Sequence, residues 1–289
     1  MPAAAVVVNA RLAGDRFRRL CRAKAAQAGW EAEVLATTSG EPGDGLARAA
    51  VAAGAELVFA AGGDGTVRAC ARALAGTGIP LAIVPLGTGN LTARALGIPG
   101  RPGAALASGF SGKDRRVDLA VADGAPFTAM AGIGLDAAVV GAARLKHRLG
   151  WLAYAASGAA HLLAAPVTFT VRLDDGEPLT RRARSVVVGN CGLLPGGFAL
   201  LPEARLDDGV LDAGVLAPGG PLGWPRIAAR VLARSRHQDR HLERFRASRV
   251  EITAATPLPR QADGELLGPG RTLTVEVWPG ALTVRVPAT

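Results

Sequence analysis

The segment "FAAGGDGTVRACARAL", residues 59–74, places three glycines and one aspartate between an apolar run and a helix-like run. The apolar run predicts a buried strand, and the residues from Thr66 onward predict a helix. Glycine lets the backbone turn sharply and present bare N–H groups to phosphate oxygens, and the helix adds the positive end of its dipole. The segment therefore predicts a phosphate-binding turn, in which Asp64 lies near Mg²⁺, a ribose or a metal-bound water.

A second glycine cluster, "PLGTGN" at residues 85–90, repeats this arrangement one predicted strand later, with Thr88 and Asn90 as polar ligands. Glycine-rich turns are common, so either cluster alone leaves the question open. Two clusters at successive strand ends predict nucleotide binding, because open α/β sheets bind ligands beyond the carboxyl ends of their strands. A GxxxxGK[ST] loop is absent, and so is GxGxxG after the first strand, which disfavours a dinucleotide oxidoreductase.

The composition is that of a globular protein with room for two domains: 289 residues, of which 49% are hydrophobic and 20% charged. The opening "MPAAAVVVNARLAG" lacks the basic segment of a secretory signal. The three cysteines are scattered without metal-ligand spacing, which favours a cytoplasmic location and disfavours a Cys/His metal site.

Two features raise the question of a membrane. Residues 150–171 carry no fixed charge, but interruptions such as Pro166 favour a buried or interfacial helix over a spanning one. Arg226, Arg230 and Arg234 follow helical spacing, either as a solvated face or as a surface attracted to anionic lipid headgroups. Nucleic acid is not an expected partner, because aromatic residues are only 4% and no reader motif is present.

The order of predicted strands and helices along the chain predicts two domains. Residues 1–120 alternate between strands and helices, which predicts an α/β domain with a mainly parallel, Rossmann-like sheet. Residues 121–289 read as hairpins with a few helices, near 135–164 and 222–235, which predicts a β-rich, sandwich-like second domain. Predicted hairpins are 117–134, which contains an Asp-Gly turn, 167–190, which contains the turn "LDDGE", and 273–287. Whether the last strand folds back onto the first domain is left open, and the two domains are expected to enclose a cleft.

Five segments in order resemble one family. Gly-Gly-Asp-Gly-Thr and Pro-Leu-Gly-Thr-Gly-Asn are joined by "VDLAVADGAPFTAMAGIGLDAAVV", "GNCGLLPGGFALLPEARLDDGVLD" and "PLPRQADGELLG". This pattern resembles the diacylglycerol kinase catalytic family, which includes bacterial soluble lipid kinases and is related to sphingosine kinases and NAD kinases. The resemblance extends over nearly the whole chain.

The resemblance implies ATP and Mg²⁺ as cofactors and assigns roles by position. Asp263 corresponds to the proton acceptor, with Glu265 beside it, while the second Asp-Gly-Glu, at Asp175, reads as a hairpin turn. A structural Mg²⁺ would be held by the Asp208 carboxylate and the carbonyls of Arg205 and Val210, although a simple acidic turn fits the same residues. The implied nucleotide contacts are Thr38, Gly62, Gly63, Asp64, Gly65, Thr66, Val67, Arg68, Thr88 and Asn90.

The implied function is an ATP-dependent lipid kinase, with diacylglycerol as the first acceptor and phosphatidic acid as its product. Departures from the family pattern are Ala10, Asp15, Arg68 and Leu91, and the last removes one carboxylate from the presumed Mg²⁺ network. The alternatives are an NAD kinase-like or other small-molecule kinase, and a non-catalytic nucleotide or lipid sensor. A lipid substrate at the inner membrane surface is the expected partner, with a homodimer left open.

Overall fold

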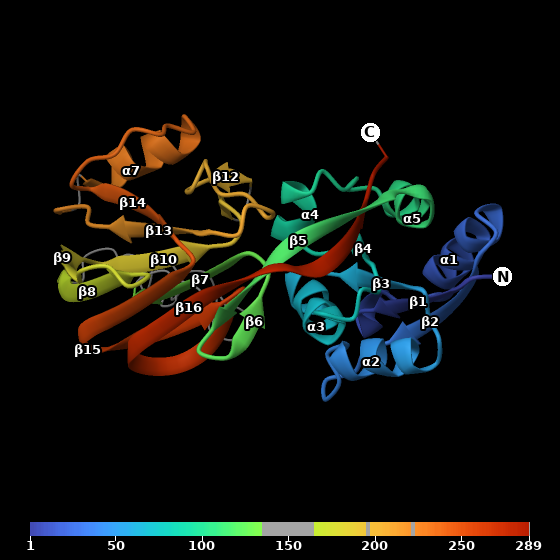
Figure 1. Ribbon diagram of the computed structural model, residues 1–289. Helices are drawn as coiled ribbons and strands as arrows, with labels where there is room; N and C mark the ends of the chain where they lie inside the picture. Colours follow the sequence, from blue (N-terminus) through green and yellow to red (C-terminus); the bar gives the residue numbers. More distant parts are fainter. Residues whose placement is uncertain (135–164, 195–196, 221–222, 289) are drawn as a thin grey trace. The chain divides into compact units, whose positions relative to one another are not determined.

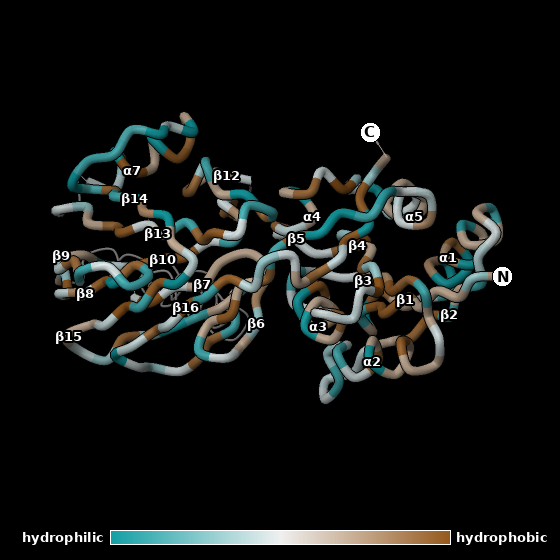
Figure 2. Tube along the Cα trace, in the orientation of Figure 1, coloured by the Kyte–Doolittle hydropathy of each residue, from teal (hydrophilic) through white to brown (hydrophobic). Residues whose placement is uncertain are grey.

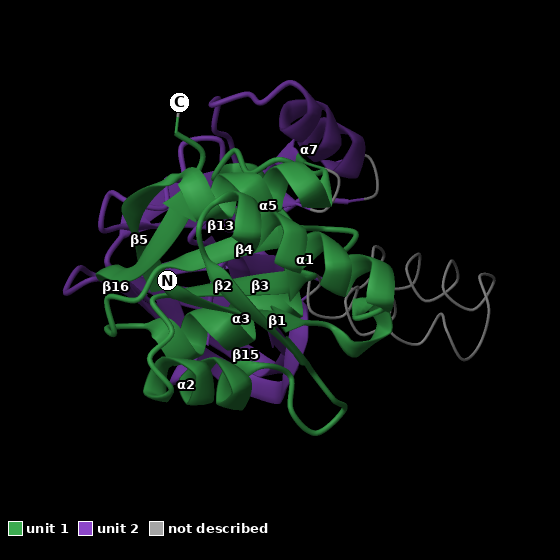
Figure 3. Ribbon diagram, turned by 90° about the vertical axis from the view of Figure 1, so that its right-hand side faces the viewer, with its two compact units in different colours: residues 1–119, 195–197, 279–289 green, residues 120–194, 198–278 purple. Residues whose placement is uncertain are grey.

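The computed structural model describes residues 1–134, 165–194, 197–220 and 223–288 (Figure 1). Two compact units divide the chain, coloured separately in Figure 3. The first contains Met1–Leu119, Pro195–Gly197 and Pro279–Thr289, and the second contains Ala120–Leu194 and Phe198–Trp278. Strands β5 (Lys113–Ala122) and β16 (Glu265–Val286) each contribute residues to both units.

The first unit alternates strands and helices, as its sequence predicts. Its elements are β1 (Ala3–Val8), α1 (Asp15–Gln27), β2 (Glu31–Ala36), α2 (Asp44–Ala52), β3 (Leu57–Gly62), α3 (Asp64–Leu74), β4 (Leu81–Pro85), α4 (Leu91–Ala95) and α5 (Pro102–Ser111). Strands β4, β3, β1 and β2 pair in parallel in that order. The carboxyl ends of these strands therefore share one edge of the sheet.

Helices cover both faces of this sheet. Helices α2 and α3 lie on one face, and α1 and α5 lie on the other (Figure 1). Because both faces are buried, β3 and β4 are apolar along their whole length rather than alternating, as the brown tube of Figure 2 shows. The rings of Phe59 and Phe110 pack with centroids 4.6 Å apart, and each buried ring contributes roughly 1.5–3 kcal/mol.

The second unit is built mainly of antiparallel strands. Its elements are β6 (Ala125–Phe127), β7 (Met130–Gly134), β8 (Val167–Leu173), β9 (Leu179–Ala183), β10 (Ser185–Gly189), β11 (Leu193–Leu194), β12 (Phe198–Ala199), β13 (Leu211–Leu216), α7 (Gly223–Leu232), β14 (Leu242–Ala247) and β15 (Arg249–Ala262). The main sheet has the order β14-β13-β10-β7-β15-β16, and β8 pairs with both β15 and β9. The predicted fold class, an α/β unit followed by a β-rich unit, is confirmed.

Two predicted hairpins are present. Strands β5 and β6 are joined by Asp123 (φ 47°) and Gly124 (φ 82°), the left-handed pair that a tight two-residue turn requires. Strands β8 and β9 form the second hairpin, and Asp175 lies exposed in its turn, as expected. The neighbouring Asp174 carboxylate accepts hydrogen bonds from the backbone N–H groups of Ser248 and Arg249, both at 2.9 Å.

The predicted hairpin at 273–287 is wrong. Residues Glu265–Val286 form one strand, β16, which pairs antiparallel with β15 as far as Glu276 and then parallel with β4 at Val284 and Arg285. Pro279 and Gly280 (φ 58°) resemble a turn in the sequence. However, the Gly280 N–H donates to the Asp118 carboxylate at 2.8 Å, so the chain changes partners here instead of reversing.

Candidate functional site

The carboxyl edge of the parallel sheet collects most of the predicted nucleotide contacts. Thr38 follows β2, Gly63 follows β3 and Thr88 follows β4. The loops are also linked to one another: the Ala10 N–H donates to Thr37 Oγ1 at 3.2 Å, and the Asn9 N–H donates to the Ala61 carbonyl at 3.0 Å. The first unit therefore presents these loops together, as a phosphate site at a strand edge requires.

The two glycine clusters touch each other. The Leu86 N–H donates to the Gly62 carbonyl at 2.8 Å. A Cβ built on Gly87 would lie 2.5 Å from the Cα of Gly63, which is too close for any side chain. Glycine is thus required at 87 because two backbones pass at close range. The expectation that these two strand tips lie side by side is confirmed.

Asp64 ties the two clusters together. Its Oδ2 accepts the Asn90 N–H at 2.9 Å, and its Oδ1 accepts the Leu91 N–H at 2.7 Å. These N–H groups begin helix α4, where a carboxylate is favoured by the helix dipole. Sequence reasoning placed Asp64 beside a cation or a ribose and missed this role. Leu91 also takes part through its backbone, although its side chain replaces the carboxylate frequent in the family.

Asn90 shapes the second loop. Its backbone is left-handed (φ 49°), a conformation that asparagine tolerates. Its side chain accepts the Gly87 N–H at 3.0 Å and donates to the Gly87 carbonyl at 2.6 Å. The loop is thus closed by Asn90, while Thr88 between these residues is exposed and available to a ligand.

Helix α3 begins at the first cluster, with Gly63 as its N-cap and Asp64 in its first turn. Thr66 and Val67 are 7% and 3% exposed, so their side chains face the core. Gly65 is exposed, and the first N–H groups of a helix have no partner within it. Nucleotide contact from this segment would therefore be made by backbone N–H groups, which fits a phosphate ligand.

The Asp263–Gly264–Glu265 turn lies in the second unit, between β15 and β16. The Asp263 carboxylate accepts four hydrogen bonds: from the N–H groups of Thr128 (2.7 Å), Ala129 (2.8 Å) and Met130 (3.0 Å), and from the Thr128 hydroxyl (2.9 Å). Burial raises the pKa of Asp263, against the opposing effect of these hydrogen bonds.

These hydrogen bonds hold the Asp263 carboxylate, and with it the turn, against the backbone of residues 128–130. A carboxylate whose lone pairs are already engaged is a poor acceptor for a substrate proton. Glu265, two residues later, is exposed. Asp263, the predicted proton acceptor, is thus held by its own turn, while Glu265, predicted to lie beside it, has the exposed carboxylate. The catalytic role of Asp263 stays a prediction.

The predicted metal turn, with Arg205, Asp208 and Val210, precedes β13. The Asp208 carboxylate pairs with the Arg246 guanidinium and accepts the Val210 N–H at 3.4 Å. Asp212 is 3% exposed, and its Oδ2 accepts no hydrogen bond from the described residues. Burial raises the pKa of Asp212 to about 6.

As arranged, these residues form a turn in which the Asp208 carboxylate is ion-paired with the Arg246 guanidinium. Across the described ranges, no cluster of three His, Cys, Asp or Glu side chains is placed to hold a metal. The structural Mg²⁺ therefore stays a prediction.

The three arginines with helical spacing, at 226, 230 and 234, form one helical face only in part. Helix α7 contains Arg226 and Arg230 but ends at Leu232, so Arg234 lies beyond it with φ 49°. Arg230 also pairs with Asp239, with 2.8 Å between Nη2 and Oδ2. A continuous cationic face is therefore not formed. The apolar stretch at 150–171 lies mostly outside the described residues, and no described helix has the length and apolar character needed to span a bilayer.

Comparisons with known proteins agree with this fold and these loops. Residues 3–122 match the diacylglycerol kinase catalytic domain, and residues 129–286 match the YegS C-terminal NAD kinase beta sandwich-like domain. A protein of Pseudomonas aeruginosa (strain UCBPP-PA14) named "Probable lipid kinase YegS-like" is 36% identical over 98% of this chain and 94% of its own length.

Two solved structures share the fold. A diacylglycerol kinase from Bacillus anthracis str. Sterne has a TM-score of 0.75 at 22% identity, covering 99% of this chain and 97% of that one. An NAD kinase from Archaeoglobus fulgidus, solved with ATP, has a TM-score of 0.55 at 13% identity, covering 100% and 94%.

The fold and the matched domains define a protein of the kinase class. The chain belongs to the diacylglycerol kinase catalytic-domain family, among the YegS-like lipid kinases. The resemblance seen in the sequence is confirmed, and so is the prediction of an enzyme of the kinase class.

Proposed function

We propose that this protein transfers the γ-phosphoryl group of ATP, bound as its Mg²⁺ complex, to a lipid hydroxyl, with diacylglycerol as acceptor and phosphatidic acid as product. The observation that carries the proposal is the joined pair of glycine loops, in which Asp64 fixes the second loop against the first. Phosphoryl transfer depends chiefly on positioning and charge stabilisation, which preformed backbone N–H groups provide.

The reaction requires a base for the acceptor. We assign this role to Glu265, whose carboxylate takes the hydroxyl proton as the lipid oxygen bonds to the γ-phosphorus. The bond from that phosphorus to the β–γ bridging oxygen breaks, and ADP leaves with the electron pair. Asp263 keeps the turn in place through its four hydrogen bonds to Thr128–Met130.

The nucleotide is supported by three features of the first unit. The start of α3 offers backbone N–H groups, Thr88 offers an exposed hydroxyl, and Thr38 lies exposed after β2. Mg²⁺ enters with the nucleotide, where it neutralises phosphate charge. In this arrangement Asp64 keeps its hydrogen bonds to Asn90 and Leu91.

The lipid acceptor is supported by the family and by the β11–β12 ribbon. Leu194 packs against a core cluster of the second unit, while Phe198 is 45% exposed. An exposed aromatic ring beside buried leucines suits contact with an acyl chain. A peripheral position on the inner membrane face follows from such an acceptor and stays a prediction.

The test is incubation of the protein with γ-labelled ATP and a panel of lipids, with NAD as a separate acceptor. Label recovered in phosphatidic acid from diacylglycerol supports the proposal. Label recovered in NADP instead would favour the NAD kinase-like alternative. Nucleotide binding without transfer to any acceptor would favour a sensor.

A further inference from the structure

The second unit contains a cationic cavity that the transfer reaction does not use. Its volume is about 700 Å³, within the usual range for small-molecule sites. It lies where the β9–β10 connection, the loop after β13, the start of α7 and the segment before β14 meet. Its lining includes Arg182, Arg184, Arg226, Arg240 and His241.

Among the described residues, the lining includes four arginines and no aspartate or glutamate, so it is positively charged. Nearby carboxylates are engaged by other arginines: Glu243 pairs with Arg181 at 2.9 Å, and Asp239 pairs with Arg230.

Three of the lining arginines lack an anionic partner. Among the described residues, no carboxylate lies within ion-pair distance of Arg182, Arg226 or Arg240. Water screens the repulsion between these guanidinium groups while the cavity is empty. A bound anion would gain attraction from all of them.

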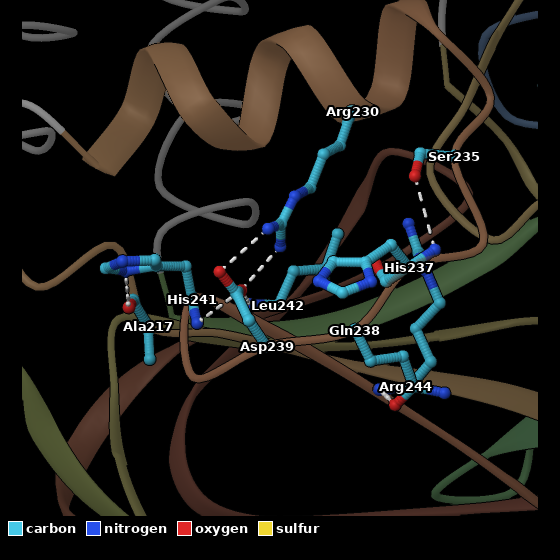
Figure 4. Close-up of polar contacts among 9 residues, drawn as sticks. All are labelled: Ala217, Arg230, Ser235, His237, Gln238, Asp239, His241, Leu242 and Arg244. Atoms are coloured by element: carbon cyan, nitrogen blue, oxygen red, sulfur yellow. Dashed lines mark hydrogen bonds and ion pairs between the residues drawn. The ribbon is translucent and has the colours of Figure 1, made fainter.

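The wall of the cavity is held in place by Asp239 (Figure 4). Its carboxylate accepts the N–H groups of His241 at 2.9 Å and of Leu242 at 3.3 Å, in addition to its pair with Arg230 of α7. These contacts fix the backbone on both sides of Arg240. The Cα of Arg240 is therefore held in place at the wall of the cavity.

His241 is oriented as well. It is 7% exposed, and its Nδ1 lies 3.3 Å from the Ala217 carbonyl oxygen. Because a carbonyl only accepts, Nδ1 carries the hydrogen, and Nε2 remains for other contacts. Gly219 (φ 71°) lets the loop pass over the ring, since a Cβ there would lie 3.3 Å from His241 Cε1. The cavity is therefore lined by a positioned imidazole as well as by arginines.

Helix α7 adds to the positive potential. It begins at Gly223, which lines the cavity, and extends over ten residues. The N-terminal end of such a helix carries about half a positive charge. The Gly223 N–H itself donates to the Gly220 carbonyl at 3.1 Å, so the arginines supply the hydrogen-bond donors. Guanidinium groups bind phosphate through paired N–H donors, so phosphate matches this cluster of arginines.

We propose that this cavity binds a phosphate monoester, separately from the nucleotide loops of the first unit. A monoester carries up to two negative charges, which suits several guanidinium groups better than a singly charged diester does. The group could come from a lipid with a terminal phosphate or from a soluble phosphate compound. The site does not depend on phosphoryl transfer, so it stands even if the proposed reaction is wrong.

The test compares wild type with the triple variant R182Q/R226Q/R240Q. These side chains are exposed and form no ion pair with the part of the chain that the structure describes, so the variant is expected to fold. The control is R19Q/R22Q/R172Q, which removes the same charge from exposed arginines outside the cavity. A saturating non-hydrolysable ATP analogue occupies the nucleotide loops. Calorimetry measures glycerol 3-phosphate binding, and sedimentation measures vesicles containing phosphatidic acid or phosphatidylglycerol.

We expect the triple variant to lose about tenfold or more in affinity for the monoester, because it removes three guanidinium groups that can donate charge-assisted hydrogen bonds to phosphate. The control should resemble wild type. Loss of glycerol 3-phosphate binding would identify a soluble source, and loss confined to phosphatidic acid vesicles would identify a lipid. Equal binding by wild type and the triple variant, equal loss in the control, or a loss as large for phosphatidylglycerol would overturn the proposal.

Discussion

The Asp64 carboxylate accepts the backbone N–H of Asn90 at 2.9 Å, across 26 residues of sequence. It also accepts the Leu91 N–H at 2.7 Å, so one side chain joins the end of β3 to the start of α4. This link explains how an acidic residue fits in a loop for which we propose phosphate binding. Its negative charge is directed at N–H groups, and the remaining N–H groups of the α3 terminus are left for the ligand.

Replacing Asp64 by alanine should separate the two glycine loops. We expect the free energy of unfolding to fall by about 2–3 kcal/mol, because two half-buried donors lose a charged acceptor. We also expect ATP binding to weaken strongly. Calorimetry with ATP and thermal unfolding measure these effects. Asp174→Ala is the matched control, since it removes a turn-capping carboxylate of the second unit. It should lower stability and leave ATP affinity unchanged, and equal loss of ATP affinity in both variants would contradict the account.

Replacing Gly87 by alanine tests the close approach of the loops. The new Cβ would lie 2.5 Å from Gly63 Cα, so one backbone must move. We expect a lower melting temperature and weaker ATP binding. Gly65→Ala is the control for stability, because a Cβ there meets no atom within 4 Å. That change should be neutral or stabilise α3 by about 0.5–1 kcal/mol. Equal melting temperatures for the two variants would show that the loops do not constrain each other.

Substitution of Asp263 should mainly lower stability, whereas substitution of Glu265 should mainly lower the rate of phosphoryl transfer. Asp263→Ala leaves three backbone N–H groups and one hydroxyl without their acceptor, so we expect a loss of about 3 kcal/mol in unfolding free energy. Glu265→Gln should unfold like wild type and keep its ATP affinity, while the transfer rate falls by about 10²–10⁴-fold. Urea unfolding and turnover measured on both variants separate the roles. Full activity in Glu265→Gln would rule out Glu265 as the base.

The free energy of unfolding should depend on pH because of Asp239. The hydrogen bond from Arg230, helped by the N–H groups of His241 and Leu242, holds the pKa of Asp239 below its usual value. The ionised carboxylate thus stabilises the folded state fully above about pH 5, and this contribution is lost as the pH falls below about 4. Asp239→Asn should lower unfolding free energy by about 2 kcal/mol at neutral pH. The difference between wild type and variant should shrink toward pH 3 in urea unfolding. A constant difference would show that the charge of Asp239 is not what stabilises the fold.

The sequence was sufficient for the strand–helix order of the first unit, because buried parallel strands such as β3 are continuous apolar runs. Helix α5 was not predicted, since its small residues give little periodicity. The continuous strand β16 was missed because Pro279–Gly280 looks like a turn. Only the partners of the flanking residues, Glu276 with β15 and Val284 with β4, show that the chain does not reverse.

For the site, the glycine clusters were predicted, but the links between residues were not. The hydrogen bonds of Asp64 to Asn90, and of Asp263 to the Thr128–Met130 backbone, join segments far apart in sequence. No local periodicity reports such contacts. The cationic cavity was missed for the same reason, because Arg182 and Arg240 meet only in the folded sheet. Asp239 follows Arg230 by only nine residues. This short separation in sequence could have indicated that the row of arginines at 226, 230 and 234 is partly neutralised.

Transfer of label from γ-labelled ATP to diacylglycerol in vesicles, measured side by side for wild type and Glu265→Gln, is the most direct test of the proposed function. We predict that wild type forms labelled phosphatidic acid, and that the variant binds ATP equally well but forms about 10²-fold less or lower still. A wild-type protein that binds ATP and labels no lipid would contradict the central claim.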